Sequence, residues 1–101
     1  MMIDDCKLDS IFDEVAQPVR TSVRQTRDSI IRDSRRRVAR NSADIAAIHV
    51  LAAANLCDRQ PDRSLDMLQT NSSAVTGNAT GHRLAAYAYL ARQEMDAAMS
   101  H

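Results

Sequence analysis

Residues that interrupt helices are nearly absent from this chain, which contains two Gly and two Pro among 101 residues. The tight turns of hairpins, meanders and barrels depend on such residues, so a fold of many short strands is disfavoured. Hydrophobic residues make up 45% of the sequence and aromatic residues only 3%, so the apolar mass is mainly aliphatic. We therefore predict an all-α fold, a small bundle of about five helices that forms one domain over residues 1–101.

Two helices are expected in the first 40 residues. The first begins near Asp4, ends before Pro18 and places apolar residues at helical spacing, at Leu8, Ile11, Phe12 and Val15. The second is predicted to start close to Val19, with Pro18 at its N-terminal edge, and to use a narrow apolar seam of Val19, Val23, Ile30, Ile31 and Val38. Residues 1–40 are thus expected to form a helical hairpin.

Three further helices follow. Asn41 and Ser42 provide capping side chains for a helix over residues 43–57, which is apolar on nearly every side and should be central and buried. A short helix is predicted from residue 62 to about 69, and a final helix from about 82 to 99. The polar segment 70–81 contains both glycines and is expected to be a loop.

Charge is distributed unevenly along this neutral chain. Residues 20–40 hold eight arginines and two aspartates, whereas residues 1–16 hold five acidic residues and one lysine. The basic segment either pairs with the acidic first helix or meets an external acidic surface, and the sequence favours neither alternative. The basic surface is predicted to comprise Arg20, Arg24, Arg27, Arg35, Arg36, Arg37 and Arg40.

Residues 34 positions apart are alike in the second half of the chain. Four residues are identical to the residue 34 positions later: Ala52 and Ala86, Ala54 and Ala88, Leu56 and Leu90, and Asp62 and Asp96. Residues 84–98 resemble the first helix and turn of a tetratricopeptide repeat, and residues 51–65 resemble a weaker copy. The sequence departs from the repeat where Asn55 replaces an aromatic residue and Gln93 replaces the turn glycine. The resemblance covers residues 45–100.

The resemblance implies that residues 42–100 form a tetratricopeptide-like helix-turn-helix followed by a capping helix. In that family, the first helix of each repeat lines a concave groove that holds a partner's helix or extended segment. Carried over by position, the partner-binding groove would be lined by Ala46, His49, Ala53, Leu56, Thr80, Arg83, Tyr87 and Leu90. The same side chains could instead pack the protein's own core.

No pattern of catalytic or metal-binding residues is evident. His49, His82 and His101 are far apart in sequence, and Cys6 and Cys57 do not form a CxxC pair. Gly77 and Gly81 lie in a loop without the lysine of a phosphate-binding motif. We therefore expect no enzymatic activity, no cofactor and no metal.

The start of the chain has no basic and apolar regions of a secretory signal, and its longest apolar run is too short to span a bilayer. These features predict a cytoplasmic protein that does not act at a membrane.

Two binding functions remain. In the first, the protein is a small helical adaptor or chaperone that holds a segment of another protein in an apolar groove, as a heterocomplex or beside a second copy of itself. The alternative is a nucleic-acid-binding or regulatory protein that uses the arginine-rich segment 20–40. Against the alternative stand the neutral net charge and the lack of aromatic residues among the arginines.

Overall fold

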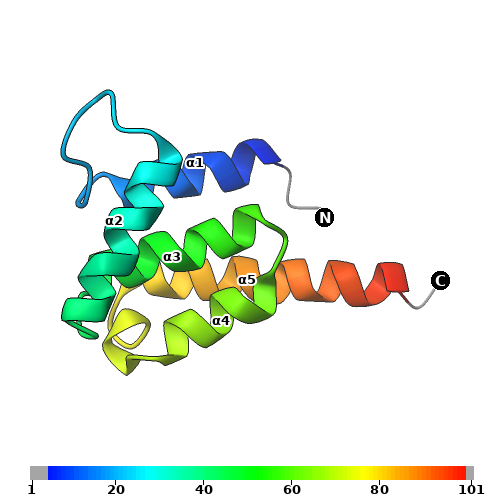
Figure 1. The fold of residues 1–101 in the computed structure, drawn as a ribbon. Helices are drawn as coiled ribbons and strands as arrows, with labels where there is room; N and C mark the ends of the chain where they lie inside the picture. Colours follow the sequence, from blue (N-terminus) through cyan, green and yellow to red (C-terminus); the bar gives the residue numbers. More distant parts are fainter. Residues whose placement is uncertain (1–4, 100–101) are drawn as a thin grey trace.

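The computed structural model describes residues 5–99, so the expected helix start at Asp4 and the position of His101 lie outside the described residues. Within this range the chain is all-helical, which confirms the predicted fold class (Figure 1). The elements are α1 (Asp5–Ala16), α2 (Arg27–Arg40), α3 (Ile45–Cys57), α4 (Pro61–Gln69), the short 3-10 helix η1 (Ser72–Ala74) and α5 (Ala79–Met99).

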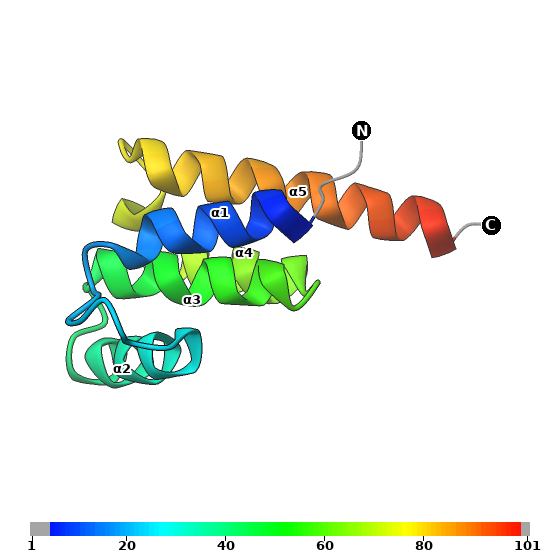
Figure 2. The same cartoon turned by 90° about the horizontal axis from the view of Figure 1, so that it is seen from above.

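Helix α3 is the axis of the bundle, because α1, α2, α4, η1 and α5 all pack against it (Figures 1 and 2). Eight of its thirteen residues are buried, and they include Ile48, Val50 and Leu56. A helix that is apolar all round must be covered on every side, as was expected for this segment. It begins at Ile45 because the side chain of Asp44 caps it by accepting a hydrogen bond from the Ala47 backbone N–H.

Helix α1 runs antiparallel to α3 and lies over the junction between α3 and α5 (Figure 2). The apolar stripe predicted for it is confirmed, since Leu8, Ile11, Phe12 and Val15 are all buried. At one end of the pair, the Cys57 thiol lies 3.6 Å from the backbone carbonyl oxygen of Leu8.

Helix α2 begins at Arg27, so the predicted start close to Val19 is wrong. The segment between α1 and α2 contains Thr and Ser side chains that bond to nearby backbone, and such bonds compete with a helix. Thr26 accepts a hydrogen bond from the Ser29 N–H and thereby sets the true start of α2. Val23, expected in the apolar seam, is 90% exposed in this loop.

The apolar residues of α2 are not all buried to the same extent. Ile30 and Ser34 are buried against α3, while Ile31 and Val38 beside them are only partly buried. The helix lies along the side of α3 that is remote from α5 (Figure 2). Its apolar seam is therefore wider than the surface that one neighbouring helix covers.

Helix α4 folds back against α3, close to where the sequence predicts a short helix. Ala52 and Ser64 are fully buried where the two helices cross, and the Ser64 hydroxyl donates a 2.9 Å hydrogen bond to the Ala52 carbonyl. Small side chains at both positions let the helix backbones approach closely. The equivalent alanine of α5, Ala86, is exposed, because no second helix packs on it among the described residues.

The segment predicted as a loop, 70–81, is partly helical, since it contains η1 and the first turn of α5. Ala74 is buried, and its carbonyl oxygen lies 2.8 Å from Nε2 of the buried His49. Because a carbonyl can only accept, Nε2 of His49 is the donor in this hydrogen bond. Helix α5 continues through Gln93, and Met95 is 42% exposed where the helix extends past the rest of the bundle (Figure 1).

Gly81 should be needed for the approach of α5 to η1. A Cβ at this position would collide with the Ala74 backbone carbonyl. We expect Gly81→Ala to lower the free energy of unfolding by about 1–3 kcal/mol, as overpacking does elsewhere, measured by urea denaturation.

Gly77→Asn is the matched control. Gly77 has a φ of +69° with no atom within 4 Å of an added Cβ, and Asn tolerates the left-handed region better than most residues. This variant should remain within about 1 kcal/mol of the wild type. Equal losses in the two variants would show that the space beside Ala74 is not the constraint.

Candidate partner-binding cleft

Helix α1 lies on the face where the groove was predicted from the resemblance. Ala53 and Leu56 are buried in the core, and Tyr87 and Leu90 are partly buried. Only Ala46, His49 and Thr80 come together around an opening, a cavity of about 240 Å³ that they share with Glu14, Val15 and Pro18. In this structure the protein's own first helix therefore covers most of that face.

Arg83, the remaining groove residue, ties α5 to α1. Its guanidinium donates two hydrogen bonds to the Glu14 carboxylate, at 2.7 and 2.9 Å. These hydrogen bonds lower the pKa of Glu14 below its ordinary value and outweigh the opposing effect of desolvation. The pair is about half exposed, so its contribution to stability is screened by water.

Several arginines of the predicted basic surface are engaged within the chain. Arg27 lies 3.1 Å from Asp9 and sits over the Phe12 ring, 4.6 Å from its centroid. Arg36 is 3.6 Å from Asp33 but remains 64% exposed. Arg20 and Arg24 lie in the loop before α2, and the Nε of Arg20 is buried without a hydrogen-bond partner.

Arg37 has a structural role at the junction of α2 and α3. Its Nε donates a 2.8 Å hydrogen bond to Asp44, the residue that caps α3. Burial alone would raise the pKa of Asp44, but the hydrogen bonds from Arg37 and from the Ala47 N–H outweigh it, and the pKa is lowered. The guanidinium of Arg37 is thus committed to the fold rather than to a partner.

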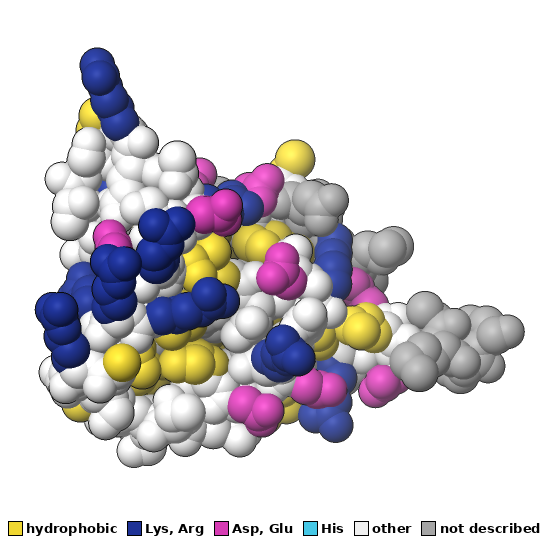
Figure 3. All heavy atoms as spheres, viewed as in Figure 1, with side chains coloured by type: hydrophobic (Ala, Val, Ile, Leu, Met, Phe, Trp, Pro, Cys, Tyr) yellow, Lys and Arg dark blue, Asp and Glu magenta, His cyan; other side chains and the backbone are white. Residues whose placement is uncertain are grey.

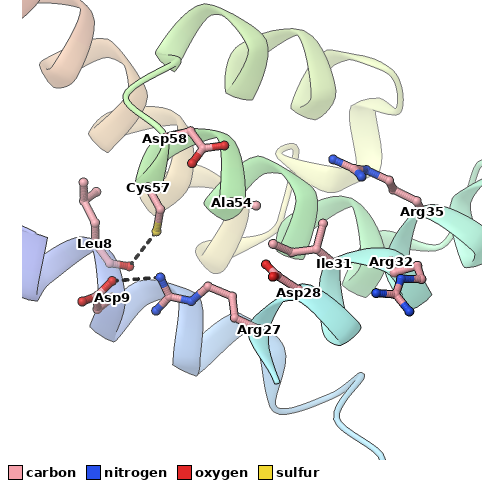
Figure 4. Close-up of a pocket in the computed structure, with 10 residues that line it drawn as sticks. All are labelled: Leu8, Asp9, Arg27, Asp28, Ile31, Arg32, Arg35, Ala54, Cys57 and Asp58. Carbon is pink, nitrogen blue, oxygen red and sulfur yellow. Dashed lines mark hydrogen bonds and ion pairs between the residues drawn. The ribbon is translucent and has the colours of Figure 1, made fainter. Parts of the chain in front are cut away.

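A cleft of about 710 Å³ opens between α2, α1 and the end of α3, and we name it the α2 cleft (Figure 4). Helix α2 contributes Arg27, Asp28, Ile31, Arg32 and Arg35. The opposite walls are formed by Leu8 and Asp9 of α1 and by Ala54, Cys57 and Asp58 at the end of α3. An adjoining cavity of about 320 Å³ shares Ile31, Arg35, Ala54 and Asp58 and extends the α2 cleft to Leu51, Asn55 and Met67.

Most of the exposed lining of the α2 cleft is polar or charged, and a smaller apolar patch lies at its floor. Figure 3 shows hydrophobic side chains between α2 and the α3–α4 pair, with Lys and Arg side chains gathered over α2. Ile31 projects toward the centre of the cleft, and Arg35 reaches over it from α2 (Figure 4). Leu51 is buried, whereas Ile31, Ala54 and Met67 are partly exposed, so this floor is not closed by the described residues.

Charges of both signs line the α2 cleft. Arg32 and Arg35 form no ion pair with any residue in the described range 5–99. Asp58 lies at the C-terminal cap of α3, where the helix dipole adds to its negative charge. The wall formed by α2 carries three arginines and Asp28 and is therefore cationic on balance, whereas the facing end of α3 is anionic.

Sequence reasoning missed two features of this cleft. Arg32 was not among the arginines assigned to the basic surface, although it lines the cleft beside Arg35. Ile31 was assigned to the buried seam of its helix, and its partial exposure follows from the side of α3 on which α2 packs. The sequence did contain a signal for the exposure of Ile31, because α2 has more apolar residues in its seam than packing against one helix can bury.

Among residues 5–99, no group of three or more His, Cys, Asp or Glu side chains is placed to hold a metal ion. No helix in the same range has both the length and the apolar character for crossing a bilayer. Comparisons with protein-family models, curated proteins and solved structures found no match.

The ion pair between Glu14 and Arg83 should make stability depend on pH. Because the pKa of Glu14 is lowered in the folded protein, the stabilisation is present above its ordinary value of 4.5 and is lost as the pH falls through the lowered value. We expect wild type to exceed Glu14→Gln by about 0.5 kcal/mol in free energy of unfolding at pH 7, and we expect this advantage to be smaller at pH 3. Urea denaturation at the two pH values measures it.

Asp13→Asn provides the control, since Asp13 is an exposed carboxylate on the same helix without a described ion pair. Its difference from wild type should be small at both pH values. A Glu14→Gln difference of the same size at pH 7 and pH 3 would contradict a role for the charged pair.

Proposed function

We propose that this protein is a non-enzymatic binding module, of the adaptor or chaperone kind, that holds a segment of another protein in the α2 cleft. The observation that carries the proposal is a partly exposed apolar floor of Ile31, Ala54 and Met67 beside two arginines without ion-pair partners in the described chain. Apolar surface bordered by unpaired charge is typical of interaction sites on proteins.

The groove expected from the tetratricopeptide resemblance is a poorer site. A partner there would have to displace α1 and expose Leu8, Ile11, Phe12 and Val15. Burial of each such side chain contributes about 1.5–3 kcal/mol, so displacement would cost a large part of the stability of a small domain. The α2 cleft is open without any rearrangement.

Nucleic-acid binding is the second candidate, supported by the exposed arginines of α2. Arg32, Arg36 and Arg40 recur every four residues, which places them along one side of the helix. However, Asp28 and Asp58 line the same cleft as Arg32 and would repel a continuous chain of phosphates. The mixed charge of the cleft favours a protein partner.

A pull-down from the native host should separate the two functions. We expect wild-type protein to retain a protein partner after nuclease treatment and to lose it when Arg32 and Arg35 are both changed to Glu. The reason is that two negative charges would replace the two positive charges of α2 that face the partner, and they would repel the partner's acidic groups. Binding to the isolated partner should be measured in 50 and 200 mM salt, because six to ten phosphate contacts would weaken binding by about 10³–10⁵ over this range.

Two control variants identify which surface of the protein binds the partner. Arg63→Glu changes an exposed arginine of α4 outside the cleft, and Tyr87→Asp changes the α5 face next to α1. Both should retain the partner. Loss of the partner with Tyr87→Asp alone would move the site to the predicted groove, and recovery of nucleic acid with a steep salt dependence would favour the second candidate.

A further inference from the structure

We infer that the occupant of the α2 cleft is an amphipathic helix with acidic residues along one edge and a basic residue along the other. This inference rests on the proposed function and adds the chemistry of the partner. It follows from three properties of the cleft: its apolar floor, the absence of a strand edge in the described residues, and the separation of charge between its walls.

The floor requires an apolar stripe on the occupant. Ile31 comes from α2, Ala54 from α3 and Met67 from α4, so three helices contribute to one partly exposed surface. Residues at positions i, i+3, i+4 and i+7 of a partner helix form a continuous stripe that could cover such a surface. Met67 adds adaptability, since its unbranched side chain can adjust to the shape of the occupant.

A helix suits this cleft better than an extended segment. Every described element is helical, so the backbone N–H and C=O groups around the cleft are largely engaged within their own helices. An extended occupant lying on the apolar floor would leave its own backbone groups without partners. A helical occupant satisfies these groups internally and presents side chains alone.

The charges on the two walls of the cleft determine which charged residues the partner helix should have on each of its edges. Arg32 and Arg35 have no described ion-pair partner, so acidic residues of the edge facing α2 would pair with them if placed beside these two arginines and away from Asp28 in the first turn of the helix. Asp58 lies across the cleft at the end of α3, beyond Ala54 (Figure 4). A Lys or Arg on the opposite edge would complement it.

A displayed library of amphipathic helices tests the inference on the full-length protein. Each peptide would have about 18 residues, a fixed stripe of Leu, and flanking positions varied among Glu, Gln and Lys. We expect selection on wild type to enrich Glu over Lys on one edge by about tenfold or more. Selection on the Arg32→Glu/Arg35→Glu variant should reverse this preference, whereas the Arg63→Glu control should preserve it.

The site of binding is read independently by NMR with one selected peptide. Backbone amide shifts should change at Ile31, Ala54 and Met67 and remain constant at Ala86 on the outer face of α5. Arg32 and Arg35 are both exposed, so their replacement by Glu should not disturb the core. A thermal unfolding curve like that of the wild type confirms that the double variant folds. The inference fails if no helix is enriched, if the charge reversal does not alter the selected charge, or if the shifts lie elsewhere.

The possible failures distinguish this inference from the proposed function. Helices that bind at the cleft without a charge preference would overturn the acidic edge and leave a protein-binding cleft intact. A single-stranded oligonucleotide that bound the cleft more tightly than any selected helix would overturn both.

Discussion

The burial of α3 on all sides is the interaction on which the rest of this structure depends. Four other α-helices pack against it with their apolar stripes, and α4 and α5 also pack against each other. Ile48 and Val50 are fully buried although they are two residues apart, which requires neighbours on different faces of the same helix. With so few aromatic residues, the protein forms its core by surrounding one aliphatic helix rather than by stacking large rings.

Charged pairs then hold the covering helices in place around α3. Arg37 joins α2 to the cap of α3, Arg27 joins it to α1 through Asp9, and Arg83 joins α5 to α1 through Glu14. Only the pair at the α3 cap is substantially shielded, with Asp44 16% exposed. The exposed pairs contribute little to stability individually, so we regard them as contacts that orient helices already held by apolar burial. The acidic first helix neutralises only part of the basic segment, and Arg32 and Arg35 remain available.

The α2 cleft follows from this arrangement. Because α2 packs on one side of α3, Ile30 is buried between the two helices while Ile31 remains partly exposed. The end of α3 and Met67 of α4 complete the floor, and Asp58 at the end of α3 is opposite in sign to the arginines of α2. Residues that are distant in sequence thereby form a surface that none of the helices has alone.

Local sequence was sufficient for the fold class, for the stripe of α1 and for the central position of α3, because each depends on the spacing of apolar residues within one helix. It was insufficient at the start of α2, where Val19 and Val23 have helical spacing. There the Gln25 side chain accepts a hydrogen bond from the Thr21 N–H within a loop, and the Thr26 side chain caps the helix that follows. Tertiary structure alone decided that α1 would cover the face assigned to a partner and that Ile31, Ala54 and Met67 would meet. The physical reason is that helix spacing defines which face of a helix is apolar, whereas the choice of the face that buries it depends on competition among all the helices at once.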